Sequence, residues 1–109
     1  MALQHAKPGE IVSLRPLGKK IKETKTTALV KSEYFETIRL IVPAGTEIPP
    51  HEVPGNIMLH CLEGCVSLGL TDSTITLSAG EWVYLAGGDM HSLRGIEDSS
   101  ILLTILLGP

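Results

Sequence analysis

Residues 45–64 read GTEIPPHEVPGNIMLHCLEG, and His51 lies between two proline-containing pairs in this stretch. Pro49-Pro50 and Pro54-Gly55 bracket the histidine so closely that the segment between them must be extended without pairing on both sides. The apolar run Asn56–Leu62 that follows is typical of a buried strand. The segment with His51 is therefore predicted at a sheet edge or barrel rim, where binding sites commonly lie.

The residues on both sides of this stretch read as short strands bounded by Gly, Pro or Asp. β-Branched residues recur, alternation is clear in Thr74–Leu77, and no stretch has a convincing helical period. The lysine-rich Lys19–Lys25 is predicted as a solvated connection or an edge strand. The predicted strands are Thr27–Ser32, Phe35–Val42, Glu47–Ile48, Asn56–Leu62, Val66–Thr71, Thr74–Leu77, Trp82–Leu85, His91–Arg94 and Ser100–Leu107.

Three turns are predicted to join consecutive antiparallel strands: Pro43-Ala44-Gly45, Glu63-Gly64 and Thr71-Asp72-Ser73. Cys61 and Cys65 are separated by three residues, a spacing that does not fit a redox or zinc pair. Both cysteines are predicted to stay reduced.

Length and charge limit the classes of protein that fit. The chain has 109 residues, enough for one domain, in which residues 1–25 are predicted to be an N-terminal segment, partly extended or mobile. A formal net charge of −3 does not suit phosphate backbones, so we expect no nucleic-acid partner. No signal core and no apolar run of spanning length are evident, so we expect a cytoplasmic protein without a membrane partner.

Two stretches resemble the motifs of one known family. Residues 45–64 resemble the first cupin motif, G-x5-H-x-H-x3,4-E-x6-G, without a gap. Residues 80–95, GEWVYLAGGDMHSLRG, resemble the second motif, G-x5-P-x-G-x2-H-x3-N. The resemblance implies a small single-domain cupin of the RmlC-like superfamily, with an all-β fold: an antiparallel double-stranded β-helix, or jelly-roll barrel.

The resemblance also implies a metal site, but one that is partly lost. Cupins typically bind a divalent metal through two histidines and a glutamate of the first motif and one histidine of the second. Here His51 and His91 match, whereas Val53 stands at the second histidine position and Ile57 at the glutamate position. Two imidazoles are fewer than zinc sites use, so the implied Fe, Mn, Ni or Zn would be held weakly.

His60 is the histidine that could supply a third ligand. In the family register position 57 faces the interior, so the two-residue period of the strand turns Ile57, Leu59 and Cys61 inward and His60 outward. A bulge after Pro54-Gly55, or a slip by one residue, would turn His60 inward beside His51 and His91. Both registers remain open because both faces of this strand are apolar.

Three further residues are candidates for the same site. Arg39 could reach into the barrel mouth and meet a carboxylate substrate. Tyr84 shares an aromatic strand face with Trp82 and could contact substrate, although such a face more often packs in a core or a dimer. Asp89 lies two residues before His91, on the same face of an extended chain, and could orient its ring.

Four functions fit these residues. The first is binding of a small molecule in a largely apolar pocket, with His51 and His91 as polar contacts and no firmly held metal. The second is a metal-dependent cupin enzyme of the dioxygenase or isomerase type that uses His51, His60 and His91. The third is a metal-free, epimerase-like enzyme with a histidine base, and the fourth is a sensing or interaction module. Whether the protein is an enzyme stays open.

A homodimer is expected with each of these functions. Ile101–Leu107 carries apolar side chains in nearly every position and offers them to both faces of a strand. A strand of this kind needs cover on both sides, from the barrel core on one and from a second subunit or the N-terminal segment on the other.

Overall fold

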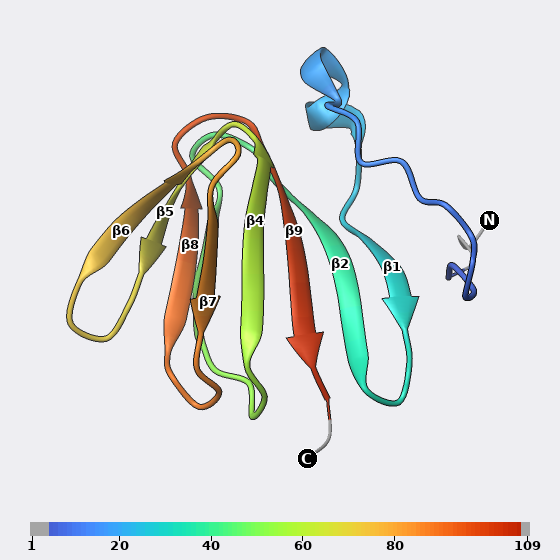
Figure 1. Cartoon of the computed structure of the whole chain (residues 1–109). Coiled ribbons are helices and arrows are strands. Elements are labelled where there is room, and N and C mark those ends of the chain that lie inside the picture. The colour runs from blue at the N-terminus through green and yellow to red at the C-terminus, as the bar shows by residue number, and fades with distance from the viewer. Residues whose placement is uncertain (1–4, 108–109) are drawn as a thin grey trace.

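The computed structural model describes residues 5–107, which form nine strands and one short 3-10 helix (Figure 1). All nine strands were predicted from the sequence to within a few residues at each end. The elements are η1 (Gly18–Glu23), β1 (Thr27–Lys31), β2 (Phe35–Val42), β3 (Glu47–His51), β4 (Ile57–Glu63), β5 (Cys65–Gly69), β6 (Thr74–Ser78), β7 (Trp82–Leu85), β8 (His91–Gly95) and β9 (Ser99–Leu106).

The strands form two antiparallel sheets. One sheet has five strands in the order β1-β2-β9-β4-β7, and the other has four in the order β3-β8-β5-β6. From β2 onward the chain changes sheet at every connection except the one between β5 and β6. This alternation between facing sheets is the jelly-roll arrangement, and it confirms the predicted fold class.

Two of the three predicted turns do not join paired strands, because of this alternation. Glu63-Gly64 joins β4 to β5, which lie in different sheets, and Pro43–Gly45 likewise joins β2 to β3. Gly64 has a φ of +87°, and a Cβ atom there would collide with the backbone of Asp98 and Ser99. The glycine therefore allows a close crossing of two connections. The turn at residues 71–73 does form a hairpin, closed by the Leu70 N–H donating to the Ser73 carbonyl over 2.7 Å.

The inner faces of the two sheets enclose one hydrophobic core. Alternate residues of each strand point into it, so the residues between them lie on the outer faces. Each large aliphatic side chain buried this way stabilises the fold by roughly 1.5–3 kcal/mol. The buried set is Val42, Ile57, Leu59, Cys61, Val66, Leu68, Leu77, Leu93 and Ile101.

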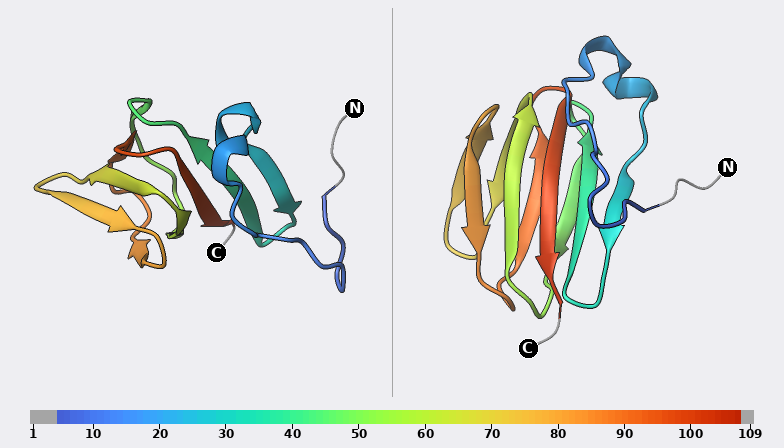
Figure 2. Two further views of the ribbon diagram at one scale, coloured as in Figure 1. Left: turned by 90° about the horizontal axis from the view of Figure 1, so that it is seen from above. Right: turned by 45° about the vertical axis from the view of Figure 1, so that its right-hand side comes forward.

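The N-terminal segment lies against the outer face of the five-stranded sheet (Figure 2). The lysine-rich stretch, predicted as a connection or an edge strand, forms η1 instead, with Ile21 only 2% exposed. A helix of six residues is too short to show an amphipathic period in sequence, which is why the pattern did not reveal it. In the described part of the chain, no helix has the length and apolarity needed to cross a membrane.

Candidate functional site

The rings of His51 and His91 pack edge to face at one end of the barrel. His51 is the last residue of β3 and pairs directly with His91, the first residue of β8. The centroids of the two imidazole rings are 4.3 Å apart, with an angle of 62° between the ring planes. Residues 40 positions apart in sequence thus form one local group, as the two motifs implied.

A β-bulge turns His51 toward His91. Ile48 pairs with Leu93 and His51 with His91, so β3 advances three residues along the ladder where β8 advances two. Plain alternation would place Ile48 and His51 on opposite faces, and the extra residue at Pro49-Pro50 restores the same face. The prolines fit there because β3 is the edge strand of its sheet, as the sequence predicted.

Both rings are held by backbone carbonyls. His51 Nδ1 lies 3.1 Å from the Pro49 carbonyl oxygen, and His91 Nδ1 lies 3.2 Å from that of Asp89. Because a carbonyl only accepts, each Nδ1 is the donor of its contact, and in the neutral form of either ring Nε2 is the acceptor. Asp89 therefore orients His91 through its main chain and not through the carboxylate that the sequence suggested.

The two histidines differ in exposure. His51 is exposed, whereas His91 is only 6% exposed. Burial lowers the pKa of His91 below its ordinary value of 6.5; the hydrogen bond to the Asp89 carbonyl opposes this shift, and the neighbouring His51 ring adds to it. The His91 ring is thus kept neutral, with a free nitrogen able to accept a hydrogen bond or a proton.

The donor set around the two rings does not match a firmly held metal. Zinc takes four protein ligands in structural sites and three in catalytic ones. Among the residues that the structure describes, no group of three or more His, Cys, Asp or Glu side chains could hold a metal ion. The family's other two ligand positions carry Ile57, which is 2% exposed, and Val53, which packs against the core.

The structure places His60 on the outer face of β4. This strand pairs residue for residue with β7 from Ile57 to His60 and with β9 from Ile57 to Cys61, so the bulged register is not formed there. Ile57, Leu59 and Cys61 are buried in the core, and His60 pairs with Trp82 and Leu102 on the opposite face. The three-imidazole arrangement of His51, His60 and His91 is therefore not present.

Arg39 and Tyr84 also lie on the outer face of the five-stranded sheet. Arg39 pairs with Leu102, which pairs with His60, so all three share a face. The Arg39 guanidinium donates to Ser100 Oγ over 2.7 Å and lies 3.4 Å from Glu63. Tyr84 pairs with Met58 and is 53% exposed. Neither side chain is brought to the histidine pair.

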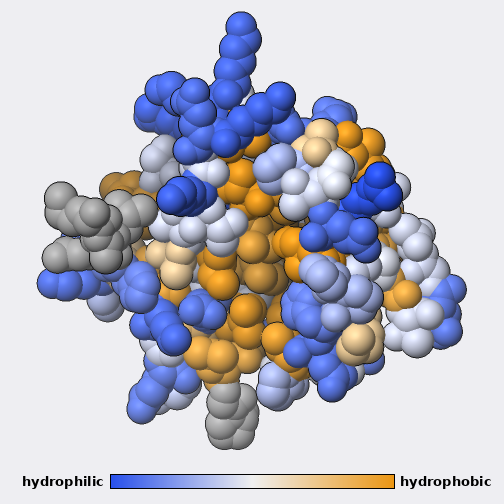
Figure 3. Space-filling model, turned by 180° about the vertical axis from the view of Figure 1, so that it is seen from behind, coloured by the Kyte–Doolittle hydropathy of each residue, from blue (hydrophilic) through white to orange (hydrophobic). Residues whose placement is uncertain are grey.

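An apolar cavity opens at the same end of the barrel as the histidines. Seen from behind, apolar side chains form a band that runs down the molecule toward the C-terminal end, between hydrophilic residues (Figure 3). A cavity of about 430 Å³ at that end is lined by Val53, Pro54, Gly55, Ile105, Leu106, Leu107 and one carboxylate, Glu36. The sequence alone does not indicate Glu36 as a site residue, because its inward direction depends on pairing with Ile105.

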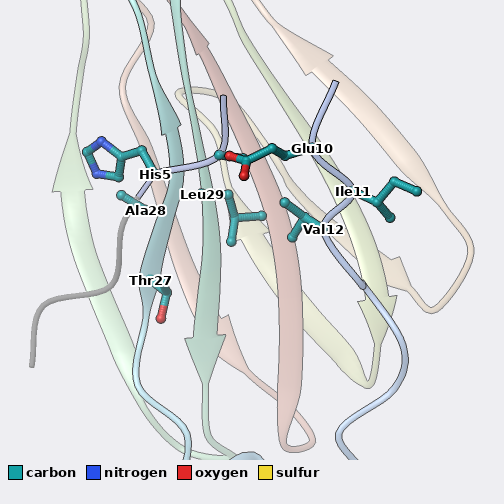
Figure 4. A pocket seen from close by; sticks show the side chains of 8 residues that line it. His5, Glu10, Ile11, Val12, Thr27, Ala28 and Leu29 are labelled. Carbon is teal, nitrogen blue, oxygen red and sulfur yellow. The ribbon is translucent and has the colours of Figure 1, made fainter. Parts of the chain in front are cut away.

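A second cavity lies away from His51 and His91, between the N-terminal segment and β1 (Figure 4). Its volume is about 280 Å³, and its walls come from His5, Ala6 and Glu10–Val12 on one side and Thr27–Leu29 on the other. The Ala6 N–H donates to the Leu29 carbonyl over 2.8 Å and holds the two segments together. β1 is the edge strand of the five-stranded sheet. The cavity is therefore the space that remains where the N-terminal segment packs against this edge.

No known family model matches the chain, and no curated protein sequence matches it. Solved structures do match. A cupin superfamily protein from Desulfitobacterium hafniense has a TM-score of 0.77 at 17% identity, over 94% of this chain and 100% of its own. An RmlC-like cupin from Desulfovibrio desulfuricans has a TM-score of 0.73 at 22% identity, over 89% and 97%.

An RmlC-like cupin with a double-stranded β-helix fold from Methanocaldococcus jannaschii has a TM-score of 0.74 at 19% identity, over 91% of this chain and 94% of its own. At identities this low, the likeness concerns the fold and not the chemistry. It agrees with the strand order and with the register in which position 57 faces inward. This chain has the double-stranded β-helix fold of the RmlC-like cupins.

Proposed function

We propose that this protein binds a small organic molecule at the His51–His91 end of its barrel, without a firmly held metal ion. The observation that carries the proposal is the pair of rings 4.3 Å apart, each with Nδ1 held by a carbonyl. Two fixed acceptor nitrogens beside apolar walls are typical of a small-molecule site, in which a few polar groups orient a largely apolar ligand.

Apolar burial supplies the affinity in this proposal. The cavity lined by Val53 and Ile105 has a volume of about 430 Å³, within the range of about 300–1,000 Å³ that small-molecule sites occupy. Each Å² of apolar surface removed from water contributes roughly 25 cal/mol, and the imidazoles then select the orientation. Val53 joins the two features, since it follows His51 by two residues and also lines the cavity.

The test is a binding experiment that reads the histidine rings directly. We would titrate the protein with a panel of small cyclic alcohols, amines and carboxylic acids and follow the histidine side-chain resonances by NMR. At least one compound is expected to shift the His51 and His91 signals and not that of His60. H51A and H91A should each abolish the response, whereas H60A, on the outer face, should retain it.

Metal content separates this proposal from the metal-dependent enzyme. Protein purified without an affinity tag should contain far less than one equivalent of Fe, Mn, Ni or Zn by elemental analysis. Near-stoichiometric metal that is lost in H51A would overturn the metal-free proposal and favour the dioxygenase or isomerase type.

We also infer that the protein is a homodimer that buries the outer face of the five-stranded sheet. Trp82 and Tyr84 are 58% and 53% exposed on this face. They adjoin Met58, His60 and Leu102, so the exposed aromatic rings continue an apolar surface. A second copy of the chain offers the same surface and could cover it by two-fold symmetry.

A further inference from the structure

A hollow beside His91 has features that the proposed function does not use. Two adjoining cavities of about 420 and 90 Å³ share Leu70 and Met90 in their walls. They lie where the β5–β6 and β7–β8 connections meet, at the lower end of the barrel in Figure 1. His91, which is 6% exposed, lines the smaller cavity, and its Nε2 has no hydrogen-bond partner within residues 5–107 and is not fully shielded from solvent.

Two carboxylates stand at the rim of this hollow. Asp72 lies in the turn between β5 and β6, Asp89 in the turn between β7 and β8, and both line the larger cavity. Neither carboxylate takes part in a hydrogen bond or ion pair with any residue that the structure describes. The remaining walls include the apolar side chains of Leu70, Leu85 and Met90, and no Lys or Arg lines either cavity.

The whole end of the barrel is acidic. The connections at this end, taken with the adjoining strand residues, span residues 31–36, which include Glu36 as the second residue of β2, and residues 51–57, 69–74 and 85–91. They carry five carboxylates and one cation, Lys31, a formal charge of −4, whereas the complete chain carries −3. A cleft lined by one sign of charge concentrates ligands of the opposite sign and repels those of its own sign. The five carboxylates are Glu33, Glu36, Glu52, Asp72 and Asp89.

We propose that the ligand of this site is an organic amine, with its ammonium group on Asp72 and Asp89 and its apolar body against Leu70, Leu85 and Met90. The inference rests on the proposed function, because both place the ligand at the His51–His91 end of the barrel. For an amine, it seats the apolar body in this hollow and not in the cavity lined by Val53 and Ile105. His91 Nε2 is free to accept a hydrogen bond from a ligand that carries a second donor. An anionic substrate is disfavoured, since no cation is available in the hollow to pair with it.

The chemistry of the hollow favours an organic cation over a metal ion. Calcium takes six to eight oxygen ligands, more than two carboxylates supply. A volume of about 420 Å³ is far larger than an ion needs and suits a molecule with a hydrocarbon body. The apolar walls would also gain nothing from an inorganic cation.

Three probes of equal size test the proposal: cyclohexylamine, which is cationic at neutral pH, cyclohexanol and cyclohexanecarboxylate. Each is titrated into the full chain, and the dissociation constant is read from the His91 ring signals. We expect the amine to bind roughly tenfold or more tightly than the alcohol, and the carboxylate to bind least. The preference for the amine should weaken at high salt.

Two double variants test whether Asp72 and Asp89 cause the preference for the amine over the alcohol. D72N/D89N should lower the amine affinity to that of the alcohol and leave the affinity for the alcohol unchanged. E23Q/E97Q removes the same number of charges in η1 and in the β8–β9 connection, where neither side chain has a partner among the described residues, and should keep the preference.

The outcomes separate the two proposals. Equal binding of amine and alcohol, or an equal loss in both double variants, would overturn the amine proposal and leave the binding site intact. Displacement of the amine by an equal concentration of Mg²⁺ would overturn it in favour of a metal ion. If no probe shifts the His51 or His91 signals, both the amine proposal and the small-molecule site are contradicted.

Discussion

The guanidinium of Arg39 lies 3.4 Å from the carboxylate of Glu63 on the outer face of the five-stranded sheet, and both side chains are largely buried. A bulge places Glu63 there: Cys61 pairs with Ile101 and Glu63 with Ser100, so one extra residue turns the carboxylate outward. That carboxylate accepts the N–H groups of Leu17 at 2.7 Å and Gly18 at 3.0 Å. The ion pair therefore fastens the N-terminal segment to the sheet.

Replacing Arg39 should leave the Glu63 charge poorly compensated. Arg39 also donates to Ser100 and to the Arg15 carbonyl, so R39M removes three interactions of a nearly buried group. We expect R39M to lower the free energy of unfolding by about 2–3 kcal/mol in urea titrations. R94M, which changes an exposed arginine of the other sheet, should cost less than about 0.5 kcal/mol. Equal effects would show that the pair adds nothing to stability.

Gly64 should tolerate no side chain because two connections cross at this point. G64A places a Cβ against Asp98 and Ser99 as well as forcing alanine to a φ of +87°. Gly80 has a φ of +86° but open space around its missing Cβ, so G80A isolates the cost of the backbone conformation. We expect G80A to destabilise by about 1 kcal/mol and G64A by a further 1–3 kcal/mol or more in thermal and urea unfolding. A similar destabilisation by G64A and G80A would show that the two connections move apart at Gly64 without a measurable cost in free energy.

The strands could be predicted from sequence because their signals are local. Gly, Pro or Asp bound most of the runs, although residues 32–34 between β1 and β2 include none of them, and the alternation within a run reports which residues share a face. The prolines around His51 likewise predict an edge strand, since proline removes a donor from the ladder. These signals do not depend on the partner strand, and the structure agrees with them.

Features that depend on distant partners could not be predicted in this way. The face of His51 is set by one extra residue relative to β8, and counting along β3 alone gives the opposite face. The crossing at Gly64 has the same local sequence signal as a hairpin. η1 is held by Glu63, a residue 45 positions away from Gly18, so its lysines alone predicted only a solvated stretch.

The burial of His91 predicts how stability depends on pH. Its pKa is lowered in the folded state, so below about pH 6.5 the unfolded chain binds the proton more readily than the folded one. The contribution of His91 to stability is therefore complete above about pH 6.5 and is lost as the pH falls toward the folded pKa. Urea titrations between about pH 7.5 and 5 should show a steeper fall for the wild type than for H91Q. Stability curves that fall in parallel for the wild type and H91Q would contradict a lowered pKa of His91.

The exposed rings of Trp82 and Tyr84 allow the proposed homodimer to be tested. W82E/Y84E puts two carboxylates where the proposed homodimer buries two rings, and charges in an interface core are costly. Light scattering at micromolar concentration should give a dimer mass for the wild type and a monomer mass for this variant. Y34E changes an aromatic residue that is 71% exposed outside the strands, and it should remain a dimer. A monomeric wild type would overturn the homodimer.

Restoring the two missing donors should restore a metal site. V53H/I57E adds an imidazole two residues after His51 and a carboxylate at an inward position of β4, which with His91 gives four donors. After dialysis against excess Zn²⁺ and then buffer, this variant should retain close to one equivalent of zinc by elemental analysis, whereas the wild type should retain little. V53H/M58E carries its carboxylate on the outer face and should behave like V53H alone. Zinc retained equally by both double variants would mean that position 57 does not face His51 and His91. No retention by either would mean that the imidazoles do not converge with that position in the geometry zinc requires.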